Sequence, residues 1–157
     1  GAMEEGAFYE GLVFAKSHQL PLVIVVDNND YSMASTTSER RCEIDLSLFC
    51  KSIGVNYLQL SDNDVQTYVT EFKGLRDAVI SSSSPAVVEA KTTLLNQHAG
   101  PTPGWPTDPM KVDISHGLVI EETASDPIFV LREKYGVKNF SKFETELGSA
   151  KLYRDVG

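Results

Sequence analysis

The feature that most constrains the fold is an uninterrupted apolar run, Leu20 to Val26, that contains no polar residue. A strand with one solvated face alternates polar and apolar residues, whereas a strand inside a parallel sheet is covered on both faces and does not. The run is also rich in Val and Ile, which favour strands. It therefore predicts a parallel strand buried on both faces, and with it an α/β domain.

The neighbouring segments agree with this prediction. Residues 6–18 place Phe8, Leu12 and Ala15 on one helical stripe, so a helix precedes the strand. The same reasoning predicts helices at 44–53, 64–81, 126–135 and 141–147, strands at 55–60 and 86–92, and loops at 30–42 and 95–109. Gly54 stands where a glycine commonly follows the end of a helix. Helices that alternate with strands are typical of a parallel sheet with helices on its faces.

Composition narrows the class of function. The net charge of -8 argues against nucleic acid or an anionic membrane as partner, and no apolar run reaches the length of a membrane span. The spacing of Cys42 and Cys50 matches no zinc or redox motif, and no segment has the pattern of a secretory signal. We therefore expect a reducing, intracellular compartment.

Two polar loops could form a cofactor site. Gly1 to Gly6 opens the first predicted helix, and Asp27 to Ser32 follows the apolar strand. Ligands of open α/β sheets bind at the carboxyl ends of strands, where a glycine lets the backbone approach a phosphate. Asparagine side chains offer oxygen ligands of the kind that magnesium prefers. The alternative is ordinary turn chemistry, because Asn and Asp favour turns.

Residues 1–33 resemble the alpha subunits of thiamine-diphosphate-dependent 2-oxo-acid dehydrogenases, the decarboxylating first component of those complexes. The resemblance is carried by Gly1-Ala2, Glu5-Gly6, Glu10, Leu20-Pro21, Asn28-Asn29 and Tyr31, and it continues through 85–92 and 126–136. It implies a three-layer thiamine-diphosphate-binding α/β fold with a mostly parallel sheet and a short helical C-terminal tail. Residues 1–110 would be part of the diphosphate-binding domain. Residues 111–157 would be a helical extension packed on that domain or on a partner subunit.

The resemblance also implies roles for individual residues. Asn29 would give its side-chain oxygen to magnesium and Tyr31 its backbone carbonyl, while Gly1, Ala2 and Asn29 would lie along the diphosphate. His98 would be an active-site histidine near the cofactor phosphate; the alternative is a solvated loop histidine.

Two features of the opening loop bear on these roles. The aspartate that supplies the family's third protein ligand to magnesium would fall just before residue 1. A full alpha subunit of this family is about twice this length, so the resemblance implies that the chain is the C-terminal portion of one. If Gly1-Ala2-Met3 is instead a cloning remnant, the resemblance at those residues is accidental.

Four charged residues near these loops have simpler explanations. Glu4 and Glu5 are expected to be helix N-terminal carboxylates, because the glutamate that activates thiamine in this family comes from the partner subunit. Arg40 and Arg41 could meet an anionic substrate or phosphate, but a solvated surface is the favoured interpretation.

The implied function is that of an alpha-like subunit that decarboxylates a 2-oxo acid and passes the acyl unit to a lipoyl carrier or another acceptor. Its cofactors would be thiamine diphosphate and magnesium. Its partner would be a beta-like, pyrimidine-binding subunit in a heterotetramer, in the cytoplasm or, in a eukaryote, the mitochondrial matrix. Two alternatives stay open: transketolase-like transfer of a ketol unit, and a non-catalytic chain that only binds a partner, which the missing aspartate would favour.

Overall fold

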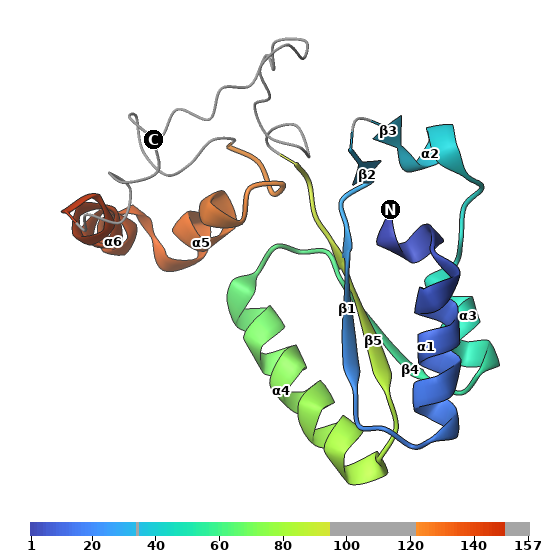
Figure 1. Cartoon of the computed structure of the whole chain (residues 1–157). Helices are drawn as coiled ribbons and strands as arrows, with labels where there is room; N and C mark the ends of the chain where they lie inside the picture. The colour runs from blue at the N-terminus through green and yellow to red at the C-terminus, as the bar shows by residue number, and fades with distance from the viewer. Residues whose placement is uncertain (34, 95–121, 150–157) are drawn as a thin grey trace.

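The computed structural model describes residues 1–33, 35–94 and 122–149. A parallel sheet of three strands has the order β1 (Val23–Asn28), β5 (Ala86–Lys91), β4 (Asn56–Leu60). On one side of the sheet lie α1 (Gly6–Ser17) and α3 (Leu46–Ser52), and on the other lies α4 (Val65–Ser82), as Figure 1 shows. The predicted α/β class with a parallel sheet between helices is therefore confirmed.

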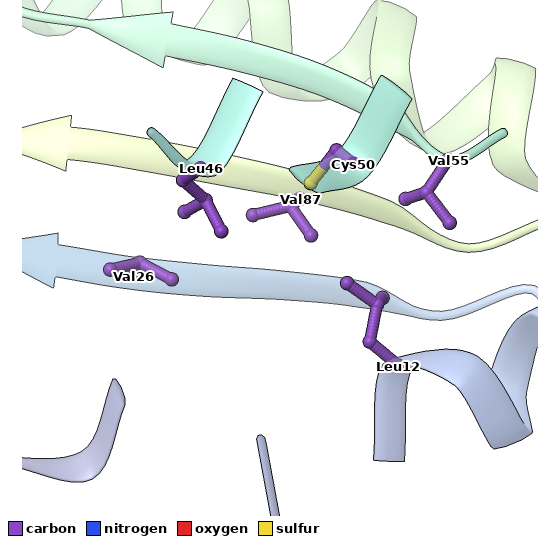
Figure 2. Close-up of a cluster of buried hydrophobic side chains, with 6 residues drawn as sticks. All are labelled: Leu12, Val26, Leu46, Cys50, Val55 and Val87. Atoms are coloured by element: carbon purple, nitrogen blue, oxygen red, sulfur yellow. The ribbon is translucent and has the colours of Figure 1, made fainter. Parts of the chain in front are cut away.

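The core lies between the sheet and the helices α1 and α3. Figure 2 shows six buried apolar side chains that meet there: Leu12, Val26, Leu46, Cys50, Val55 and Val87. Burial and the nearby Glu89 raise the pKa of the Cys50 thiol, so this cysteine packs as a small apolar residue. Gly54 has a φ of +67° directly after α3, which confirms its predicted place at the helix end.

The prediction for the apolar run was wrong in two respects. Strand β1 begins at Val23 instead of Leu20, because the Leu20 N–H bonds back to Ala15 of α1 at 2.9 Å. The strand is also covered on one face only: Val25 is 54% exposed, whereas its partner Val88 on β5 is fully buried. β1 stands at the edge of the sheet among the described residues, next to β5 alone.

The predicted loop at 30–42 was also wrong, because it contains short regular elements. Strands β2 (Tyr31–Ser32) and β3 (Ser35–Thr36) form a small antiparallel pair, followed by the helix α2 (Thr37–Arg40). A capping box begins α2: the Thr36 side chain accepts the backbone N–H of Glu39, and the Glu39 carboxylate accepts the backbone N–H of Thr36. Before α1, the turn η1 (Ala2–Glu4) opens the chain. These elements surround the carboxyl end of β1.

The C-terminal helices are α5 (Pro127–Tyr135) and α6 (Val137–Ser149), the second beginning four residues before its predicted start. The segment before α5 and α5 itself contact the residues just before α4: Asn63 donates to the Ala124 carbonyl at 2.8 Å, and Lys134 lies 2.5 Å from the carboxylate of Asp64, the α4 N-cap. The division at residue 110 stays a prediction. In the parts of the chain that the structure describes, no helix combines the length and apolar character of a membrane span.

The ion pair between Asp64 and Lys134 predicts how the stability of the fold changes at low pH. The Lys134 hydrogen bond is the largest of the effects that lower the pKa of Asp64 to about 2. A carboxyl with a lowered folded-state pKa stabilises the fold above its unfolded pKa of about 4, and this contribution disappears as pH falls through about 2. In Lys134→Met, an NMR titration of the Asp64 carboxyl should show a higher pKa, whereas Lys138→Met should change nothing. An equal pKa in Lys134→Met and the wild type would contradict the pairing.

Candidate functional site

A cavity of about 490 Å³ lies at the carboxyl end of β1, between η1, the loop after β1, and α2. Its walls include Gly1, Ala2, Asn29 and Tyr31, which are four of the five residues that the sequence singled out. The fifth, His98, lies outside the described residues. Residues from the first turn and from the loop after the strand therefore meet at the edge of the sheet where ligands of α/β folds bind.

Gly1 makes a close approach possible on one wall. A Cβ atom added at this residue would lie 2.9 Å from the Ser32 hydroxyl oxygen, which is closer than two such atoms normally come. Glycine at this position lets the opening turn lie against β2 with the Ser32 side chain where it is, whereas a larger residue would require the Ser32 hydroxyl to move. The turn then closes on itself, since the Glu4 N–H donates to the Gly1 carbonyl at 2.8 Å.

The loop after β1 is held by the Asn29 side chain. Its Oδ1 atom accepts the Tyr31 N–H at 3.0 Å, and its Nδ2 atom donates to Asp27 Oδ2 at 3.2 Å. Asp30 between them has a φ of +65°, a conformation that Asp and Asn tolerate. The turn chemistry expected from the sequence is thus present in the wall of the cavity. An amide oxygen has two lone pairs, so it can accept a hydrogen bond and bind a cation at the same time.

Side chains of β5, of β4 and of the residue after β5 form hydrogen bonds that hold the end of β1, next to this loop. Glu89, with 9% of its surface exposed, accepts hydrogen bonds from Asn28 Nδ2 at 2.6 Å and from the Tyr57 hydroxyl. Burial, with the nearby Glu89 carboxylate, raises the pKa of Tyr57, so the phenol stays protonated and can donate. Thr92 adds a second set of contacts: its N–H donates to the Asn28 carbonyl at 3.2 Å, and its hydroxyl donates to Asp27 Oδ1 at 2.6 Å.

Sequence reasoning placed Asp27 in the candidate loop without a role of its own, and it missed Tyr57, Glu89 and Thr92. One signal was available, because Glu89 is a charged residue inside an apolar strand. Its partners depend on strand register: β5 pairs Glu89 with Val26 on one side and Gln59 on the other, which brings residues of β1 and β4 beside it.

The arginines have a more specific role than a solvated surface. Arg40 donates from Nε and Nη2 to the Glu4 carboxylate at distances of 2.9–3.2 Å, and Arg41 Nε lies 3.4 Å from the same group. The hydrogen bond from Arg40 is the main cause that lowers the pKa of Glu4. These three side chains tie η1 to α2 across the cavity, and the favoured interpretation of Arg40 and Arg41 as merely solvated was wrong.

The two sides of the cavity carry opposite charges. Arg40 and Arg41 outnumber the single carboxylate of Glu4 on the side formed by η1 and α2, whereas Asp27 comes from the end of β1 and Asp30 from the loop after it. Among the described residues, no cluster of three or more His, Cys, Asp or Glu side chains could hold a metal ion alone. This arrangement suits an anion together with a hard cation that takes part of its oxygen ligands from that anion.

A second cavity, of about 550 Å³, extends along the same edge of the sheet toward β4. It is lined by Glu89 and Lys91 of β5 and by Asp45 at the start of α3. It shares Asn28, Asp30, Thr37 and Arg41 with the first cavity. Hydrogen bonds from Ser47 and from the Leu48 N–H lower the pKa of Asp45, which caps α3. The two cavities are therefore neighbours at the carboxyl edge of the sheet and have part of their lining in common.

Comparisons with known proteins cover most of the chain. The sequence model of a family described as "Dehydrogenase E1 component" matches residues 1–112. A pyruvate dehydrogenase E1 component subunit alpha from Rickettsia typhi is 30% identical over 99 residues, which are 63% of this chain and 30% of that protein. The same subunit from Staphylococcus aureus is 27% identical over 98 residues, or 62% of this chain and 26% of that protein.

The matched residues thus span less than a third of the length of these relatives. Among solved structures, a transketolase from Campylobacter jejuni aligns with 96% of this chain and 26% of its own, with a TM-score of 0.46 and 16% identity.

Proposed function

The chain belongs to the dehydrogenase E1 component family, and from this premise we propose that it is the alpha-like subunit of an enzyme that decarboxylates a 2-oxo acid. The acyl unit would pass to a lipoyl carrier or another acceptor. The observation that carries the proposal is the meeting of Gly1, Ala2, Asn29 and Tyr31 around one cavity. The family match favours this chemistry over transfer of a ketol unit.

The residues present fit magnesium and thiamine diphosphate, the cofactors that the family typically uses. Asn29 and Tyr31 offer an amide and a carbonyl oxygen, which suit magnesium and not a soft metal. Glycine at residue 1 lets the opening turn lie close to β2, and the cavity volume is within the usual range for small ligands. We propose that Asn29 and Tyr31 hold magnesium and that Gly1, Ala2 and Asn29 lie along the diphosphate.

When bound, thiamine diphosphate supplies an electron sink for decarboxylation. The chain's own part is to bind and orient. Arg40 and Arg41 place positive charge at one side of the cavity and hold η1 in position through Glu4. The Asn29 side chain also fixes the backbone at Tyr31, because Asn29 Oδ1 accepts the Tyr31 N–H.

The remaining parts of the proposal concern the assembly. We propose that His98 is an active-site histidine near the cofactor phosphate, and that 111–157 is an extension which packs on the domain of 1–110 or on a partner. The partner would be a beta-like subunit that binds the pyrimidine ring, in a heterotetramer of the cytoplasm or mitochondrial matrix.

An assay on the full natural chain, co-purified with its partner, tests this function. Pyruvate, a branched-chain 2-oxo acid and 2-oxoglutarate would be offered in turn, with a ketose phosphate as the ketol donor. We expect release of CO2 from at least one 2-oxo acid, and only with both subunits, thiamine diphosphate and magnesium present. Ketol transfer without CO2 release, or no turnover by a complex that has bound the cofactor, would contradict the proposal.

A further inference from the structure

We propose that Asp27 and Thr92 are positioning residues that set the orientation of the Asn29 side-chain amide, so that its oxygen and not its nitrogen faces the cation. The inference rests on the proposed function, because it concerns the ligand that Asn29 would supply. Three contacts carry it: Thr92 Oγ1 to Asp27 Oδ1 at 2.6 Å, Asn29 Nδ2 to Asp27 Oδ2 at 3.2 Å, and the Tyr31 N–H to Asn29 Oδ1 at 3.0 Å.

The orientation of an asparagine amide is set by its hydrogen bonds, because its oxygen and NH2 ends are nearly equal in shape. Only the oxygen can bind a cation, since the NH2 end directs its protons outward. An ionised carboxylate accepts hydrogen bonds and donates none. Asp27 therefore attracts Asn29 Nδ2, and this turns Oδ1 the other way, toward the Tyr31 N–H.

Thr92 keeps Asp27 in the position that this requires. The register pairs Asp27 with Ala90 and Asn28 with Lys91, so Thr92 comes directly after the last pair. Its N–H holds the Asn28 carbonyl while its hydroxyl holds Asp27 Oδ1. Each oxygen of the Asp27 carboxylate thus has a neutral donor, one from the Thr92 hydroxyl and one from the Asn29 amide.

This arrangement argues for an indirect role of Asp27. Both carboxylate oxygens are directed at neighbouring donors, and the amide that one of them holds belongs to the proposed metal ligand. The Thr92 hydroxyl carries no charge, so its removal leaves the charge of the cavity unchanged. A variant at Thr92 therefore separates the orientation of the amide from simple attraction between Asp27 and a cation.

The test measures Mn2+ affinity by electron paramagnetic resonance, in the full natural chain with its partner and thiamine diphosphate. We expect Thr92→Val to weaken Mn2+ binding about tenfold, the size typical of losing a residue that orients a ligand. Thr92→Ser, which keeps the hydroxyl, should restore it. In an Asn29→Ala background, Thr92→Val should have no further effect.

Thr67→Val is the matched control, because Thr67 makes the same hydroxyl–carboxylate bond to Asp64 at 3.0 Å at the beginning of α4. This variant should bind Mn2+ as the wild type does. If Thr92→Val also binds as the wild type while Asn29→Ala weakens binding, the inference is wrong and the proposed function stands. If Asn29→Ala leaves the affinity unchanged, the inference and the assignment of Asn29 as a metal ligand are both wrong.

Discussion

Replacement of Asn29 by alanine is expected to weaken the magnesium-dependent binding of thiamine diphosphate by about 100-fold or more. Loss of a residue that only orients a ligand already costs 10- to 100-fold in metal affinity, and this change removes the ligand oxygen itself. It also releases the Tyr31 N–H from Asn29 Oδ1, so the neighbouring carbonyl loses its fixed place. Calorimetry on the full natural chain with its partner, with magnesium present, measures the effect.

Two further variants separate binding from folding in this experiment. Asn29→Asp keeps an oxygen that can accept the Tyr31 N–H and bind a cation, so it should bind the cofactor far better than Asn29→Ala. Asn56→Ala changes an exposed asparagine at the beginning of β4, at the other end of the sheet, and should leave the affinity unchanged. Wild-type affinity in Asn29→Ala would refute the assigned ligand.

Leu12→Ala should lower the free energy of unfolding by about 3 kcal/mol, because it leaves a hole in a packed core. Leu12 is fully buried between α1 and the sheet, among the side chains of Figure 2. Equilibrium unfolding in guanidinium chloride, followed by circular dichroism, measures the loss.

Leu48→Ala is the matched control for the core. Leu48 is on α3 but is 61% exposed, so its truncation should change stability by no more than about 0.5 kcal/mol. Equal losses in Leu12→Ala and Leu48→Ala would show that the core does not lie where α1 meets the sheet.

Much of the fold could be predicted from local pattern, and the errors have physical causes. The helix predicted at 6–18 is α1, Gly6–Ser17, because a helical stripe repeats over several turns and is easy to detect. The pair β2 and β3 was missed because strands of two residues have no periodicity. The exposure of Val25 was missed because the apolar run says nothing about which neighbours the strand has.

In the candidate site, too, residues of a local motif could be predicted and contacts between distant residues could not. Asn29 and Tyr31 could be found in the sequence because the motif that contains them is local. The contacts of Arg40 with Glu4 and of Thr92 with Asp27 join residues 36 and 65 positions apart. They depend on how β1 pairs with β5 and where α2 packs, and no short pattern specifies either arrangement.

The most direct test of the central claim is to locate the metal. A crystal structure of the full natural chain with its partner, Mn2+ and thiamine diphosphate would show the ion by its anomalous scattering. We predict that the ion is bound by the Asn29 side-chain oxygen and the Tyr31 carbonyl, with the diphosphate along Gly1 and Ala2. An ion and a diphosphate bound elsewhere, with the cavity between η1 and the β1 loop empty, would contradict the account.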